Sequence, residues 1–195
     1  DILPDDTDEI FFEFYDQLVP EPIPTLLDRK SEQDIRLVSY NTLNEGILDP
    51  NRQSHFRRII QALDPDIIAL QEHSEWGSID DIIQSWFPND DWNASWTYGD
   101  LVVLSNFSII SHTQLSSDRS MAVLIETVDR IGKNLLVFNS HLSCCSNDED
   151  RQDQVDSFTS DWREWRLNNT VPFEIEESTP FIHVGDFNFV GYRKQ

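Results

Sequence analysis

The sequence is poor in the residues that mark fibrous, repetitive or disulfide-stapled proteins. Its 195 residues include 6 Gly, 9 Pro, 2 Cys and 1 Met, which excludes collagen-like and low-complexity architectures. No apolar run approaches the roughly 18 residues of a membrane-spanning helix, and no repeat of fixed period occurs. Cys144 and Cys145 are adjacent, so they do not form an ordinary disulfide framework.

Basic residues are also scarce. Lys and Arg number 14 against 36 Asp and Glu, a formal net charge of -22. Such a charge repels phosphate backbones at long range, which disfavours a passive nucleic-acid-binding module. It remains compatible with an enzyme that recruits divalent cations, because bound cations invert the local field. The alternative reading of the charge is a solubility device.

What the sequence does contain is enough apolar material for a core. Hydrophobic residues make up 38% and aromatic residues 11%, and the length suggests one domain, or one domain with a tail. Residues 1–34 are an acidic, Pro-rich leader with one aromatic group, Phe11–Tyr15. We expect that group to dock on the domain surface or to add an edge strand. Residues 35–195 form the domain.

From residue 35 onward, apolar strands alternate with amphipathic helices. Apolar residues at positions i, i+3, i+4 and i+7 predict helices around residues 56–63 and 79–86, and a similar pattern predicts one over 155–165. Short apolar runs predict strands at 35–40, 66–71, 92–97, 101–105, 108–113, 121–128, 134–139 and 181–184. The strands at 121–128 and 134–139 form a hairpin around residues 129–132. The pattern favours an α/β fold with a mixed sheet, or two packed sheets, and helices outside.

Compact polar groups follow four of these strands. They are Asn41, Glu72, His141, and the pair Asp186 and Asn188. In sheets with helical crossovers, ligands bind beyond the carboxyl ends of strands, so neighbouring strands would bring these groups to one site. Carboxylate, amide and water suit Mg²⁺, and Mg²⁺ with a His and a second carboxylate suits attack on phosphorus. Taken singly, each residue also fits a turn, an ion pair or a core histidine.

Together these segments resemble the endonuclease/exonuclease/phosphatase superfamily, the group of pancreatic deoxyribonuclease and the abasic-site endonucleases. The resemblance covers residues 35–192, and the order and spacing of the LQE, NSHL and GDFN motifs make it strongly specific. The matching segments are Ile35–Asn41 (IRLVSYN), Pro65–Glu72 (PDIIALQE), Leu101–Ile109 (LVVLSNFSI), Val137–Leu142 (VFNSHL) and Val184–Asn188 (VGDFN).

The resemblance implies a four-layer α/β sandwich of two mixed sheets flanked by helices, and divalent-metal hydrolysis of phosphoesters. By motif, Glu72 binds the metal, Mg²⁺ with Mn²⁺ or Ca²⁺ as alternatives, and Asn41 lies beside it. His141 contacts the phosphate and can serve as an acid. Asp186 positions or activates the attacking water, and Asn188 holds the phosphate or the neighbours of Asp186.

Two features depart from the family. Its closing Ser-Asp-His segment has no counterpart, because no Asp-His pair occurs and the chain stops at Gln195. The sequence therefore looks like a C-terminally truncated member, and we expect an incomplete fold with exposed apolar faces and no activity of this chain alone. Some members carry an acid two residues after the first Asn, where this chain has Leu43. Asn44 and Glu45 are nearby but take no assigned role.

Three functions remain open from the sequence. A nuclease-like phosphoester hydrolase comes first, with a phosphatase or phosphodiesterase on lipid or small-molecule phosphates as the alternative. The third is a catalytically inactive fragment or binding module. The His141-x-x-Cys144-Cys145 spacing fits zinc only weakly. We expect a phosphate-ester substrate, with nucleic acid as one candidate, no transmembrane segment, and a secreted or periplasmic location rather than a cytoplasmic one.

Overall fold

Two four-stranded sheets form the centre of the computed structural model, which describes residues 27–74, 79–97, 99–168 and 173–189. The first sheet has the order β1 (Leu37–Asn41), β2 (Ile67–Gln71), β4 (Val102–Ser105) and β3 (Asn93–Trp96). The second has the order β5 (Ile109–Gln114), β6 (Ser120–Ile125), β7 (Leu135–His141) and β8 (Phe181–Asp186). Both sheets are mixed: β1–β2 and β7–β8 pair parallel, and the other neighbours pair antiparallel.

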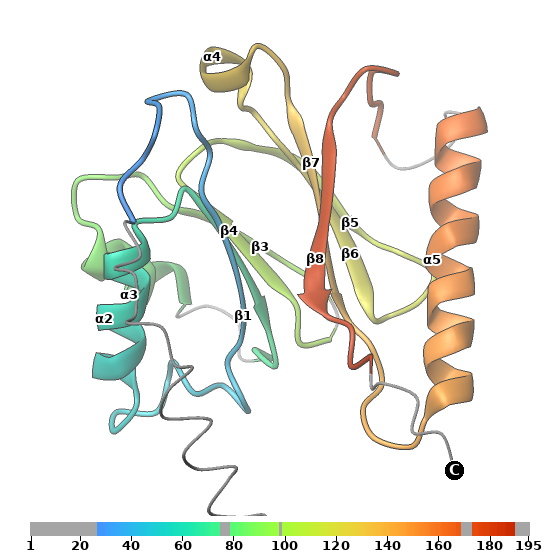
Figure 1. The fold of residues 1–195 in the computed structure, drawn as a ribbon, viewed down its shortest axis with the longest axis horizontal. Coiled ribbons are helices and arrows are strands. Elements are labelled where there is room, and N and C mark those ends of the chain that lie inside the picture. The colour runs from blue at the N-terminus through green and yellow to red at the C-terminus, as the bar shows by residue number, and fades with distance from the viewer. Residues whose placement is uncertain (1–26, 75–78, 98, 169–172, 190–195) are drawn as a thin grey trace, which may run out of the picture.

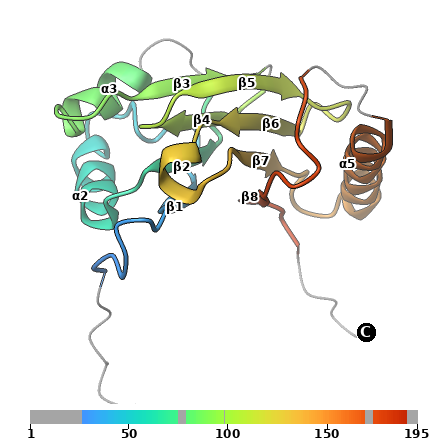
Figure 2. The same cartoon turned by 90° about the horizontal axis from the view of Figure 1, so that it is seen from above.

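Helices cover the outer faces of both sheets. Figure 1 shows α2 (Gln53–Leu63) and α3 (Ile79–Trp86) beside the first sheet, and α5 (Asp148–Asn168) beside the second. Figure 2 shows the same succession from above, with α2 and α3 at one end of the molecule and α5 at the other. The predicted four-layer α/β sandwich of two mixed sheets flanked by helices is confirmed.

Side-chain alternation along the strands divides the core into three layers. In β2, Ile67 and Ala69 pack in the cluster between the sheets, and Ile68 and Leu70 pack in the cluster under α2 and α3. All five residues of β2 are buried, as expected of a strand covered on both faces. On the far side, Phe138 of β7 lies in a third cluster with residues of α5. Each sheet thus packs against an apolar core on both of its faces.

Several predicted boundaries differ from the structure, and two of the differences have a clear physical reason. α5 begins at Asp148, seven residues before Val155, the first apolar position of the predicted pattern. Three acidic residues fill its first turn, where carboxylates favour the helix N-terminus but leave no hydrophobic signal. The β6–β7 hairpin is confirmed, but its connection contains the short helix α4 (Val128–Ile131), which ends at Gly132 with φ of +77°.

Arg29, near the end of the predicted leader, contacts residues 64 and 66. The Arg29 guanidinium donates to the carboxylate of Asp66 at 2.6 and 3.0 Å, and to the carbonyl oxygen of Asp64 at 2.9 Å. The Asp66 carboxylate is buried and also accepts the backbone N–H of Arg36 at 2.8 Å, so its charge is paired and hydrogen-bonded. The aromatic group Phe11–Tyr15 lies outside the described residues. Within the described part of the chain, no helix has both the length and the hydrophobicity needed to cross a membrane.

Candidate functional site at the strand ends

The five polar residues that the sequence singled out lie together at one end of the two sheets. β1 and β2 run parallel, as do β7 and β8, and the register aligns His141 with Asp186. The Asn41 side-chain amide donates to Glu72 Oε1 at 2.8 Å and to Asp186 Oδ2 at 2.9 Å. One amide therefore joins the ends of three strands from both sheets. The predicted convergence is confirmed, whereas the roles of these residues remain predictions.

Glu72 is held by the loop that follows β1. Its Oε2 accepts the backbone N–H of Asn44 at 2.8 Å, and its carbonyl oxygen accepts the N–H of Glu45 at 2.8 Å. Leu43, Asn44 and Glu45 have φ values of 51°, 51° and 60°, a left-handed conformation that costs about 1–2 kcal/mol for each non-glycine residue. The contacts with Glu72 offset this strain. Asn44 thus contributes its backbone, and Leu43 is exposed.

His141 has a partner that the sequence analysis missed. Its Nδ1 lies 2.5 Å from Oδ2 of Asp100, and its Nε2 lies 3.9 Å from Oε1 of Glu72. A carboxylate can only accept, so Nδ1 carries the proton in this bond. Asp100 precedes β4, which runs antiparallel to β2. The start of β4 therefore lies at the same edge as the end of β2, and only this pairing reveals Asp100.

Electrostatics favour the ionised forms of this pair. The hydrogen bond to Asp100 raises the pKa of His141, against the effect of burial, and the charges of Asp100, Asp186 and Glu72 add to the rise. Burial would raise the pKa of Asp100, but the hydrogen bond and charge of His141 outweigh it and lower that pKa. His141 is therefore suited to donate from a protonated ring.

Replacing Asp100 by Asn is expected to lower the pKa of His141. The Asn oxygen can still accept from Nδ1, but the variant loses the charge assistance of this hydrogen bond and the negative charge of Asp100, while Asp186 and Glu72 remain. In the wild type, the His141 contribution to stability is present below the ordinary histidine pKa and is lost as pH rises through the raised value. An NMR titration of the His141 ring in chelator-treated protein measures the change. An unaltered titration in Asp100→Asn would show that the contact does not govern the ring.

Asp186 and Asn188 belong to one turn after β8. Asp186 Oδ1 accepts the backbone N–H of Asn188 at 3.1 Å, and Asn188 has φ of 50°. The Asn188 side chain donates to the carbonyl oxygen of Leu142 at 2.8 Å, and the Leu142 N–H donates to the carbonyl oxygen of Asp186 at 3.0 Å. Asn188 therefore ties the end of β8 to the segment that follows β7.

The donor set of the site fits a hard divalent cation that keeps much of its water. Glu72 and Asp186 offer carboxylate oxygens on either side of the Asn41 amide, and Mg²⁺ is commonly held by one or two carboxylates and several waters. Among the described residues, no group of three or more His, Cys, Asp or Glu is arranged so that it could hold a metal ion by itself. Asn41 Oδ1 accepts the N–H of Leu43 at 2.8 Å, so its role as a ligand stays a prediction.

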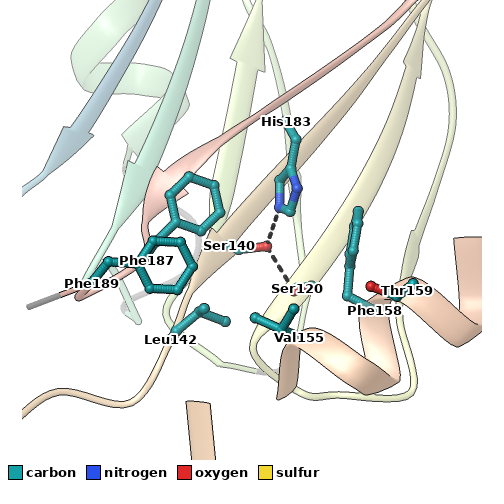
Figure 3. Close-up of a pocket in the computed structure, with 9 residues that line it drawn as sticks. All are labelled: Ser120, Ser140, Leu142, Val155, Phe158, Thr159, His183, Phe187 and Phe189. Atoms are coloured by element: carbon teal, nitrogen blue, oxygen red, sulfur yellow. Dashed lines mark hydrogen bonds between the residues drawn. The ribbon is translucent and has the colours of Figure 1, made fainter. Parts of the chain in front are cut away.

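A hollow of about 330 Å³ lies on the opposite face of β7, between β8 and α5. Figure 3 shows Ser140 joined to Ser120 and to His183 by hydrogen bonds of 2.7 and 2.8 Å. The ring of Phe158 from α5 stacks on the His183 ring, with the two ring centroids 4.2 Å apart, and Phe187 and Phe189 line the other wall of the hollow. Burial lowers the pKa of His183 to about 4. His183 is therefore neutral at pH 7 and lies outside the polar site.

His183→Gln is expected to weaken the loss of stability below neutral pH. In the unfolded chain a histidine takes up a proton below about pH 6.5, whereas His183 in the folded protein stays neutral down to about pH 4. The unfolded state therefore binds more protons between these values, and stability falls as pH is lowered through them. Urea unfolding at pH 5 and pH 7 measures the difference, with His112→Gln as the control. An equal loss in wild type and His183→Gln would contradict the prediction.

Solved structures share this arrangement of sheets and helices. The human Nocturnin catalytic domain with bound sulfate aligns with a TM-score of 0.62 and 17% identity over 82% of this chain and 66% of its own. TDP2 of D. rerio, complexed with a single-strand DNA product, aligns with a TM-score of 0.55 and 17% identity over 80% of this chain and 62% of its own. ANGEL2, a 2',3'-cyclic phosphatase, aligns with a TM-score of 0.57 and 17% identity over 80% of this chain and 53% of its own. At these identities the likeness shows the fold, and the chain spans 53–66% of these three structures.

At the level of sequence, no curated protein matches this chain. The profile of the Endonuclease/Exonuclease/phosphatase family, however, matches residues 38–192. That interval runs from β1 through the turn after β8, and it contains Asn41, Glu72, His141, Asp186 and Asn188. The match and the shared fold lead to one conclusion: this chain belongs to the endonuclease/exonuclease/phosphatase family.

Proposed function

We propose that this protein is a divalent-metal-dependent phosphoester hydrolase, nuclease-like, in which water attacks phosphorus in line with the leaving group. The observation that carries the proposal is the joining of Glu72 and Asp186, from different sheets, through the Asn41 amide, with His141 beside Glu72. Family membership supports the reaction class. The chain spans only part of its structural relatives, so the activity of the whole protein is part of the proposal.

In this proposal Glu72 holds the cation, with Asn41 beside it. Mg²⁺ is the first choice and Mn²⁺ or Ca²⁺ are alternatives, since the donors are hard oxygens. When bound, the cation supplies positive charge that stabilises the phosphoryl oxygens in the transition state. The chain's own residues supply orientation and proton transfer.

His141 donates from its ring to a phosphate oxygen. Asp100 engages Nδ1 at 2.5 Å, which leaves Nε2 to face the substrate. The raised pKa of His141 favours protonation of this nitrogen, and a protonated ring stabilises negative charge. Asp186 orients the attacking water and accepts its proton. Each of its oxygens already accepts one hydrogen bond, from Asn41 and Asn188, and these bonds fix the direction in which the carboxylate points.

A phosphatase or phosphodiesterase acting on lipid or small-molecule phosphates is the second candidate. The net charge of -22 favours it, because long nucleic acids bring many phosphates against an acidic surface. The experiment is a Mg²⁺ titration of the full-length protein on plasmid DNA, abasic-site DNA and phosphoinositides, with EDTA as the control. Metal-dependent cleavage of DNA supports the nuclease, and turnover confined to phosphoinositides supports the second candidate. No turnover of any substrate would indicate an inactive binding module.

The cell compartment is a separate proposal. A secreted or periplasmic location is our expectation from the sequence, and fractionation of cells that express the protein tests it. Recovery in the cytoplasmic fraction would overturn it.

A further inference from the structure

Two amide side chains are buried in the mostly apolar space between the sheets. Gln71 of β2 is 1% exposed and Asn139 of β7 is 0% exposed. The same space is filled by Ile67, Val123, Val137 and other aliphatic residues. Burying an amide is unfavourable unless its donors and acceptors find partners, so the pair needs a physical explanation.

The partners of these amides lie across the gap between the sheets. Asn139 Nδ2 donates to the carbonyl oxygens of Leu70 and Val102 at 2.8 and 3.1 Å. A carbonyl oxygen accepts only, so this contact fixes which end of the Asn139 amide is nitrogen. Its Oδ1 then accepts from Gln71 Nε2 at 2.7 Å. These three hydrogen bonds connect the second sheet to β2 and β4 of the first.

The same residues lie directly behind the candidate site. Gln71 is followed by Glu72, and Asn139 precedes His141 by two residues on the same face of β7. Val102, whose carbonyl oxygen Asn139 contacts, follows Asp100 by two residues. Gln71 Nε2 also donates to Ser39 Oγ at 3.2 Å, two residues before Asn41. Each of these residues thus lies one or two positions along the chain from a residue of the site.

The site itself is divided between the sheets. Asn41, Glu72 and Asp100 come from the first sheet or the segments at its edge, and His141 and Asp186 come from the second. Apolar packing is non-directional, so aliphatic contacts alone leave the sheets some freedom to slide. Hydrogen bonds are directional and specify both distance and register. A displacement of about 1 Å can cost about a hundredfold in rate.

We propose that Gln71 and Asn139, together the amide clasp, are positioning residues that set the separation and register of the two sheets at the site. The clasp acts through Glu72, His141 and the Asp100–His141 hydrogen bond, and does not contact the substrate. Its effect on turnover rests on the proposed hydrolase function, whereas its effect on the Asp100–His141 contact does not.

The test is the double substitution Gln71→Met with Asn139→Leu. The double substitution removes both partners of the Gln71–Asn139 hydrogen bond, so neither amide stays buried without its partner. The carbonyl oxygens of Leu70 and Val102 lose the Asn139 donor. We expect at most a modest fall in the melting temperature and a kcat lowered roughly 10- to 100-fold, with a smaller change in KM. We also expect the downfield Nδ1 proton resonance of His141, deshielded by the 2.5 Å bond to Asp100, to move upfield or broaden.

Val137→Ala is the matched control, on the same strand and facing the same core. It should lower the melting temperature while preserving kcat and the His141 resonance. If the double variant does not fold, Gln71→Met alone provides the same readouts, because it keeps both carbonyl contacts of Asn139.

The two proposals fail in different ways. A wild-type protein without turnover refutes the hydrolase, and the His141 resonance still decides the clasp. A double variant that keeps both the resonance and any wild-type kcat would overturn the clasp and leave the two amides as core filling.

Discussion

Glu72→Gln is expected to reduce metal-dependent hydrolysis by the full-length protein by about a hundredfold or more. The charge stabilisation that a bound cation gives the phosphoryl transition state is worth several kcal/mol, and an amide binds Mg²⁺ far less well than a carboxylate of the same size. If Glu72 holds the cation as proposed, raising the Mg²⁺ concentration should restore part of the activity, because the defect then lies in cation binding.

The fold should survive this substitution. Gln keeps an oxygen for the Asn41 amide but places its own NH₂ opposite the N–H of Asn44, which now meets Glu72 Oε2 at 2.8 Å. Losing one such contact costs about 1–3 kcal/mol, and relief of the repulsion between Glu72 and Asp186 acts in the opposite direction.

The measurement is a Mg²⁺ titration of hydrolysis alongside thermal melting. Glu164→Gln, the same chemical change on the exposed face of α5, is the control and should leave both properties as in the wild type. Full activity of Glu72→Gln at low Mg²⁺ would remove Glu72 from the site. A large fall in its melting temperature would make Glu72 a structural acid instead.

Gly185→Ala is expected to destabilise the protein by about 3 kcal/mol or more, through backbone strain and overpacking. Gly185 has φ of +144°, and a Cβ there would lie 1.9 Å from the carbonyl oxygen of Ser140 and 2.8 Å from its backbone nitrogen. These are backbone atoms of the paired strand β7, so the clash can be relieved only if β7 and β8 move apart. That separation would displace Asp186 from His141, and activity should fall with stability.

Gly132→Ala is the control that distinguishes the steric clash at position 185 from the backbone strain of a positive φ. Gly132 also has a positive φ, +77°, but a Cβ there would meet no atom within 4 Å. Its cost should be only the left-handed strain of about 1–2 kcal/mol. Urea unfolding of both variants gives the two losses. Equal losses would mean that the close approach of β7 and β8 is not the reason for glycine at position 185.

Much of the fold could be predicted because local spacing records which residues face a core. The alternation in β2 and the helical spacing of Phe56, Ile59, Ile60 and Leu63 are set by backbone periodicity, so each element carries its own signal. Where a helix face is solvated the signal fades, which is why the acidic first turns of α5 were missed. The motifs also located Asn41, Glu72, His141, Asp186 and Asn188, since each follows a recognisable strand.

The sequence by itself therefore determined the strands, the amphipathic helices and the five residues that end the strands. Only the tertiary structure decided which groups those residues meet. Asp100 precedes His141 by 41 positions and Asn139 follows Gln71 by 68, and periodicity shows which face a side chain occupies but not which strand lies opposite it. Those partners depend on how two separate sheets stack, and stacking is a property of the whole core rather than of any local segment.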